Sequence, residues 1–170
     1  MNKIIVTGKM NVDVSSAMVL SFLQNIKNID RYEPKLISAE IIEAQPDKGF
    51  YKAKGTFLNF RWRGKFTYEL NYQGFHSRMV GGPLSNKMQG GFAVYAISEN
   101  SCCVIHYEEY QFPRWTILLK PLFRYYLKKL MIQELKTIQD LLQEKLISKK
   151  AIKNNNHENI SAVVKFLTTY

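Results

Sequence analysis

The sequence of 170 residues has few of the residues from which specialised sites are built. Its two cysteines, Cys102 and Cys103, are adjacent in a strand-like run, so they point to opposite faces and do not favour a mutual disulfide. The cysteines and the three histidines show no metal-ligand spacing, and neither a Ser/His/Asp order nor a phosphate-binding glycine loop is present. We therefore expect a cytoplasmic protein that has no metal and no cofactor.

Membrane-spanning and targeting patterns are also missing. No apolar run approaches the length needed to cross a bilayer, and residues 1–6 carry no signal-peptide pattern. The net charge of +10 favours acidic partners, but the basic residues are scattered without a dense block. Arg61, Arg63 and Lys65 share one face of a predicted strand, and the aromatic residues between them fall on the other face. This separation argues against nucleic acid as a partner, because single-strand binders place bases on aromatic groups within a basic surface.

The composition is that of one domain with a substantial core, since 46% of the residues are apolar and 13% are aromatic. Ten tyrosines and ten phenylalanines can line a cavity as well as fill a core. Alternation with a period of two predicts seven strands, at 2–10, 36–44, 50–57, 59–72, 75–80, 90–98 and 101–112. Because the connections are short, we expect an antiparallel meander.

Helices are expected at two places. Two short helices fall between the first two strands, the first starting near Asp13 and the second covering 25–32 and ending before Pro34. A long amphipathic helix occupies much of 113–149, with Pro121 inside its first turn. Its apolar face is formed by Phe123, Leu127, Leu130, Met131, Ile138, Leu141 and Leu142.

The composition becomes polar after Lys149. We expect a linker there, followed by a short amphipathic tail from about Asn159. The predicted division is a ligand-binding domain at 1–150 and a polar linker with its tail at 151–170.

Glu134 interrupts the apolar face of the long helix. Burying a bare carboxylate is costly, so this side chain must be paired or face a polar environment. Two interpretations stay open. Glu134 forms an ion pair with an Arg, Lys or His of the sheet, or it is a polar group inside a ligand pocket.

The order of these elements and several motifs resemble the START-like (SRPBCC) helix-grip superfamily, specifically its polyketide cyclase/dehydrase and lipid-transport branch. The matching stretches are 12–32 with Pro34, 49–70, Val80-Gly-Gly-Pro-Leu84, Met88-Gln-Gly-Gly-Phe92, 101–113 and Lys120-Pro-Leu122. The resemblance covers roughly residues 3–148, and Phe92 stands where many relatives carry Trp. It implies an α+β fold in which a curved antiparallel sheet wraps around a long C-terminal helix and leaves a hydrophobic cavity between them. Members bind lipids, quinones, sterols or polyketides, and some are cyclases.

Three functions follow as hypotheses. The first is binding or transport of a hydrophobic small molecule, the second an aromatase/cyclase-type enzyme with an acid/base pair in the same cavity, and the third a basic protein-interaction module. The predicted ligand-binding residues are Trp62, Phe66, Tyr68, Phe92, Val94, Tyr107, Phe123, Leu127, Leu130 and Glu134.

The enzyme hypothesis depends on which face of the last strand points inward. His106 and Glu108 are weak catalytic candidates if their face does so. The alternate face, which includes Cys103 and Tyr107, is slightly more apolar and is favoured as the inner one.

The start of the long helix mixes basic and apolar residues outside the main stripe. Trp115, Lys120, Arg124 and Lys128 suit peripheral contact with an anionic membrane. The alternative is that the apolar groups pack against neighbouring loops.

Overall fold

The computed structural model describes the backbone of residues 2–167 and the side chains of residues 2–146. The strands are β1 (Asn2–Val12), β2 (Leu36–Ala44), β3 (Lys48–Phe57), β4 (Phe60–Asn71), β5 (Gly74–Gly81), β6 (Met88–Ser98) and β7 (Ser101–Phe112). The helices are α1 (Ser16–Leu23), η1 (Ile26–Asn28), α2 (Ile29–Tyr32), η2 (Arg114–Leu119) and α3 (Lys120–Leu167), where η marks a 3₁₀ helix. The predicted strands and short helices are confirmed to within a few residues at each end.

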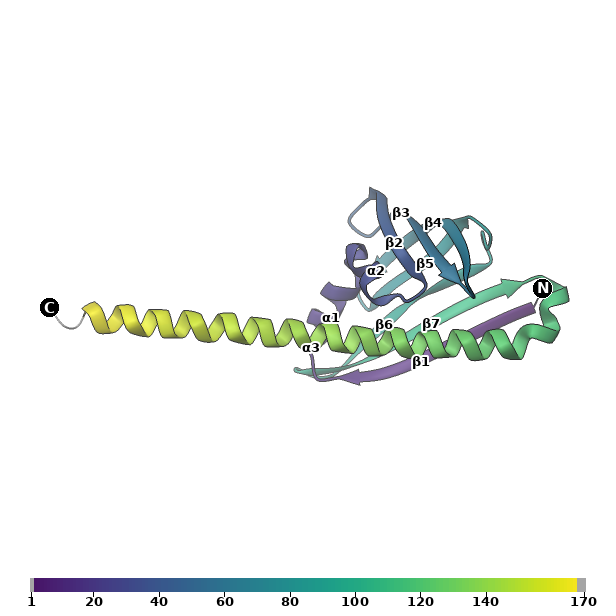
Figure 1. Cartoon of the computed structure of the whole chain (residues 1–170). Coiled ribbons are helices and arrows are strands. Elements are labelled where there is room, and N and C mark those ends of the chain that lie inside the picture. The colour runs from purple at the N-terminus through teal and green to yellow at the C-terminus, as the bar shows by residue number, and fades with distance from the viewer. Residues whose placement is uncertain (1, 168–170) are drawn as a thin grey trace. The chain divides into compact units, whose positions relative to one another are not determined.

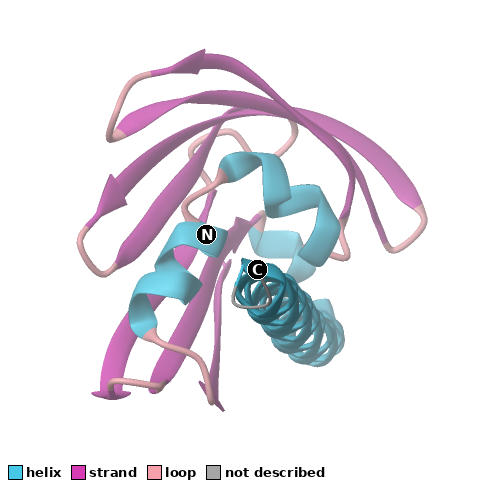
Figure 2. Cartoon of the chain, turned by 90° about the vertical axis from the view of Figure 1, so that its left-hand side faces the viewer, coloured by secondary structure: helices cyan, strands magenta, loops and turns pink. Residues whose placement is uncertain are grey.

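All seven strands form one antiparallel sheet in the order β1-β7-β6-β5-β4-β3-β2. The strands from β2 to β7 follow one another as a meander, and β1 adds to the sheet beside β7 along eleven residue pairs. Figure 1 shows α1 and α2 in the connection between β1 and β2. Figure 2 shows the strands curving around α1, α2 and the first part of α3, residues 120–138, which lie on the concave face. The predicted curved α+β fold is confirmed.

The concave face of the sheet carries the core because its strands alternate buried and exposed residues. In β1, Ile4 and Val6 are buried whereas Ile5 is exposed. The helix α1 covers part of this face with Val19, Phe22 and Leu23. Cys102 and Cys103 are both buried and carry free thiols.

Gly8 lets α3 come close to β1. A Cβ atom at this position would lie 2.6 Å from Leu135 Cδ1 and 3.1 Å from the Met131 side chain, so a larger residue would force these two side chains of α3 to shift. Pro121 lies in the first turn of α3, as predicted, where its missing N–H leaves no helical hydrogen bond unmade.

The chain forms two compact units, residues 1–138 and 139–170. The backbone of α3 is helical to Leu167, and so it continues through the segment that the sequence predicts as a linker. The side chains of the predicted amphipathic tail lie outside the described residues, and the domain boundary at residue 150 stays a prediction. Among the described residues, no helix has both the length and the apolar character to span a bilayer.

Candidate functional site: a buried ionic cluster beside an apolar cavity

The inner face of β7 carries the polar side chains of the site. Val104, His106, Glu108 and Tyr110 are buried at alternate positions along this strand. The apolar content of the opposite face, which contains Tyr107, predicts that face as the inner one, and this prediction is wrong. The apolar content of a face is misleading here because the polar residues of the other face, His106 and Glu108, form ion pairs inside the protein.

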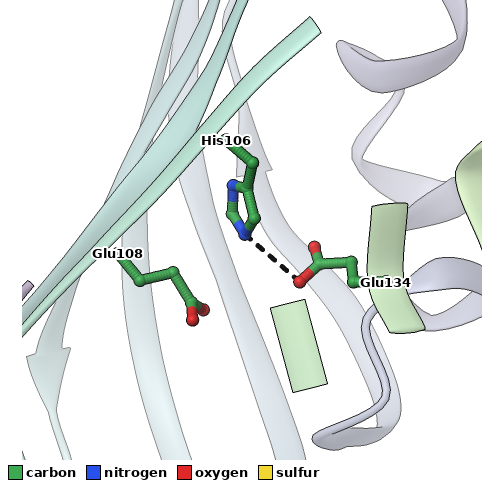
Figure 3. Close-up of side chains that lie close together, drawn as sticks. All are labelled: His106, Glu108 and Glu134. Atoms are coloured by element: carbon green, nitrogen blue, oxygen red, sulfur yellow. Dashed lines mark ion pairs between the residues drawn. The ribbon is translucent and has the colours of Figure 1, made fainter. Parts of the chain in front are cut away.

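His106 is held between the sheet and α3. Its Nδ1 donates a hydrogen bond to the carbonyl oxygen of Gly91 at 2.9 Å, and its Nε2 lies 3.2 Å from Glu134 Oε2. The ring of Phe92, opposite His106 in the β6–β7 register, stacks on the imidazole with centroids 4.0 Å apart. Figure 3 shows His106 and Glu108 reaching from β7 towards Glu134 of α3. Both interpretations of Glu134 are supported, since it pairs with a histidine of the sheet and lines a cavity.

Lys35 supplies the second cation of the cluster. This lysine precedes β2, is almost completely buried, and forms an ion pair with Glu108 Oε1. Its Nζ also lies 3.3 Å from Glu33 Oε2 and donates a hydrogen bond to the Tyr110 hydroxyl at 3.1 Å. The carboxylate of Glu33 in turn accepts a hydrogen bond from the backbone N–H of Lys35 at 3.0 Å. We call Glu33, Lys35, His106, Glu108 and Glu134 the ionic cluster.

The protonation of the ionic cluster follows from burial and from its internal charges. Burial alone lowers the pKa of His106, but the carboxylate of Glu134 opposes it and the net effect raises this pKa to about 9. Burial, with repulsion from Glu134, raises the pKa of Glu33 to about 8 despite the nearby ammonium of Lys35. The pKa of Glu108 is lowered, because Lys35 and His106 outweigh the effect of its burial. At neutral pH the cations of Lys35 and His106 therefore face the carboxylate of Glu108, while the raised pKa keeps Glu33 mostly protonated.

Two cavities meet at the ionic cluster. The inner cavity has a volume of about 50 Å³ and is lined by His106, Glu108 and Glu134 together with aromatic side chains. The outer cavity has a volume of about 260 Å³. Apart from Lys35 and Arg61, its lining residues are apolar or aromatic: Phe57, Phe60, Trp62, Met79, Pro83, Leu84, Met88, Tyr110 and Phe112. Lys35, Trp62 and Met88 line both cavities, so the outer, apolar space lies next to the polar inner one.

The predicted ligand-binding residues fall into three groups. Trp62, Phe66, Phe92 and Glu134 line a cavity. Five residues line neither cavity. Tyr68, Val94 and Leu127 are buried in the core, Phe123 packs against Phe112 of the cavity wall, and Leu130 is half-buried on α3.

Tyr107 requires a correction. It lies on the outer face of β7, where its hydroxyl is 2.6 Å from His76 Nδ1. It therefore cannot orient a ligand inside the cavity.

Sequence reasoning missed Lys35 and Glu33, which are central to the cluster. They flank Pro34 in the connection between α2 and β2, and a charged pair around a proline is typical of an exposed loop. No local pattern distinguishes them from the other charged residues of the chain. Only the long-range pairing with Glu108 reveals their role, across 73 positions of sequence for Lys35.

His106, Glu108 and Glu134 are also the group that could hold a metal ion, within the part of the chain whose side chains are described. One ligand atom from each lies within 4.8 Å of the others. A metal here would have to displace a proton from His106 and compete with Lys35 for Glu108. Lys35 and His106 already place two cations against these carboxyl groups, and the function proposed below uses no metal.

No protein-family model and no curated protein sequence matches this chain. Solved structures do match it. The aromatase/cyclase Zhui from Streptomyces sp. R1128 superposes with a TM-score of 0.73 at 9% identity, covering 85% of this chain and 96% of that one. The chain has the helix-grip fold. A START superfamily protein from Mycobacterium smegmatis gives a TM-score of 0.68 at 9% identity, with 82% and 97% covered. Ara h 8.0201 gives 0.62 at 10% identity, with 84% and 99% covered.

Proposed function

We propose that this helix-grip protein binds and carries a hydrophobic small molecule in the outer cavity. The observation that carries the proposal is the lining of that cavity, which is almost entirely apolar and ends at a buried ionic cluster. Such a space matches the usual ligand site, an apolar pocket with a few convergent polar groups. A two-ring aromatic guest that buries about 200 Å² of apolar surface would gain roughly 5 kcal/mol before the cost of association.

Filling the outer cavity tests this proposal. Leu84 is half-buried in the β5–β6 connection and lines the cavity, so Leu84→Trp should occupy space that the guest needs. We expect at least a tenfold loss of affinity for the neutral fluorescent probe N-phenyl-1-naphthylamine, which corresponds to about 1.4 kcal/mol. Ile42→Trp, at an exposed position of β2, is the matched control and should bind like the native protein. Equal affinities for the native protein and Leu84→Trp would contradict the proposal.

A second candidate function, docking to an anionic membrane, is favoured by the surface of η2 and the first turns of α3. Trp115 and Leu118 are 76% and 88% exposed, and Ile117, Leu122 and Tyr125 are also exposed. Residues 111–133 contain five basic residues and no acidic one. An exposed apolar patch that is flanked by cations alone suits insertion between anionic headgroups. We call this patch the η2 surface.

The η2 surface is joined to the outer cavity through aromatic side chains. Phe123 of α3 packs against Phe57 and Phe112, with ring centroids 6.2 and 5.0 Å apart, and both of these partners line the cavity. Phe60, at the hairpin between β3 and β4, lines the same cavity and is itself 78% exposed. A protein docked through the η2 surface would thus hold its cavity near the bilayer, from which it could load an apolar guest.

Charge placed on the η2 surface tests the docking. We expect Leu118→Glu to reduce sedimentation with vesicles of phosphatidylcholine and phosphatidylserine at least tenfold, because it adds a charge where an apolar group would insert. Tyr72→Glu, in the equally exposed β4–β5 turn, is the control and should keep vesicle binding. The native protein could instead fail to bind these vesicles and bind acidic proteins in a salt-sensitive manner. This result would favour the hypothesis of a basic protein-interaction module.

The enzyme alternative gains one observation, since His106 and Glu108 both line the inner cavity. An imidazolium beside two carboxylates is a suitable proton donor for general acid–base chemistry. The discriminating experiment follows hydrogen–deuterium exchange at the central carbon of a cyclic 1,3-diketone. If the native protein accelerates this exchange and His106→Gln does not, the result favours the enzyme. If the exchange proceeds at the rate in buffer alone with both proteins, the result favours the carrier.

A further inference from the structure

We propose that the guest of this cavity carries a hydroxyl group, such as that of a phenol, an enol or an alcohol, at the end that reaches the ionic cluster. The inference rests on the proposed function, because it names the chemical class of guest for the same cavity. It comes from the hydrogen-bonding groups that the protein leaves unpaired at the inner end.

Four buried polar atoms that belong to lining residues of the inner cavity have no hydrogen-bond partner among the side chains that the structure describes. They are the Tyr32 hydroxyl, His106 Nε2, Glu108 Oε2 and Glu134 Oε2. The Nε2 of His106 and the Oε2 of Glu134 lie 3.2 Å apart as an ion pair, and neither has a further hydrogen-bond partner among the described side chains. Unsatisfied buried groups are costly, and so many at one point indicate a place where a ligand completes the bonding.

The kinds of unpaired atoms select the chemistry of the guest. Two are carboxyl oxygens of Glu108 and Glu134, one is the His106 Nε2, whose raised pKa favours the donating imidazolium, and the fourth is the Tyr32 hydroxyl, which can donate or accept. A hydroxyl can donate to a carboxylate and accept from the imidazolium at the same time. A ketone or an ether can only accept and leaves both carboxylate oxygens unpaired, whereas a carboxylate guest would add a negative charge beside Glu108 and Glu134.

The position of the cluster agrees with this assignment. Lys35, Trp62 and Met88 line both cavities, so a guest whose body lies in the outer cavity can extend one end towards His106. The inner cavity, at about 50 Å³, has room for a small polar group and not for a second ring. We therefore expect the ring system of the guest to remain in the outer cavity and its hydroxyl group to enter the inner cavity.

Competition between matched ligands tests the inference. The protein is loaded with N-phenyl-1-naphthylamine and titrated with 1-naphthol, 1-methoxynaphthalene and 1-naphthoate. We expect 1-naphthol to displace the probe at a concentration at least tenfold lower than the methyl ether, and 1-naphthoate to be the weakest of the three. The two neutral competitors share the ring system, and the ether replaces the hydroxyl proton by a methyl group, so the ratio reports the hydrogen bond to a carboxylate together with the added methyl, and the Glu134→Gln variant below separates the two.

A variant of the cluster sharpens the test. Glu134→Gln replaces an acceptor-only group by one that also donates, and we expect the preference for 1-naphthol over the methyl ether to fall to within about threefold. Glu69→Gln, at an exposed position of β4, should keep the full preference. If the methyl ether competes as well as 1-naphthol on native protein, the hydroxyl assignment is overturned while the cavity proposal stands. If the probe itself does not bind, it is the proposed function that fails.

Discussion

Replacing Lys35 by methionine is expected to lower the free energy of unfolding by about 3–5 kcal/mol, because it leaves the buried carboxylate of Glu108 without its cation. Lys35 is the direct ion-pair partner of Glu108 Oε1, and both side chains are only 4% exposed. Glu33 and the Tyr110 hydroxyl lose the same partner. Methionine matches the length of the lysine stem, so the lost charge rather than lost volume accounts for the effect.

Urea unfolding followed by circular dichroism measures this loss, and two further variants identify its cause. Lys54→Met, at an exposed position of β3, should change the stability by less than about 0.5 kcal/mol. Adding Glu108→Leu to Lys35→Met removes the uncompensated charge and should restore part of the stability. A Lys35→Met protein as stable as the native one would contradict the ionic cluster described above.

The stability of the protein is expected to fall as the pH rises from about 6.5 to 9. The pKa of His106 is raised from 6.5 to about 9 in the folded protein, so its protonation stabilises the fold fully below pH 6.5 and this contribution is lost as the pH passes through 9. A shift of this size corresponds to roughly 3 kcal/mol. Glu33 acts in the same direction between pH 4.5 and 8, because its raised pKa makes the folded protein bind a proton that the unfolded chain releases.

The groups that face His106 define the experiment. They are Glu134 from α3, Glu108 from β7, and Lys35 through its ion pair with Glu108. Urea midpoints measured between pH 6 and 9.5 should decline for the native protein and decline less for His106→Gln. At the acid end the lowered pKa of Glu108 works the other way, and stability is lost as the pH falls through that pKa. A midpoint that rises between pH 6.5 and 9 would contradict the assigned charges.

Much of the fold could be predicted because its signals are local. Strict alternation in 59–72 predicted β4, and the proline at position 34 marked the end of the short helices before β2. The order of the elements then pointed to the curved sheet around a long helix. The end of α3 was predicted too early, since a polar composition after Lys149 is compatible with a helix as well as with a linker.

The candidate site was predicted only in part, because its members are brought together by the sheet. Glu134 could be found, since a carboxylate within an apolar stripe of a helix demands a partner. The inward direction of His106 and Glu108 could not be predicted, since both faces of β7 carry polar residues and the deciding partners, Lys35 and Glu134, lie on other elements. Ion pairs between residues of different elements do not produce a periodic pattern in the sequence.

The most direct test of the central claim uses the two tryptophans as reporters of where an apolar guest binds. Trp62 lines both cavities, whereas Trp115 lies on the exposed η2 surface. Titration with N-phenyl-1-naphthylamine should quench the emission of Trp115→Phe, which retains Trp62, strongly and saturably at one site. The emission of Trp62→Phe should be quenched less. If the probe leaves Trp62 unquenched at saturation, or does not bind at all, the outer cavity is not a ligand site.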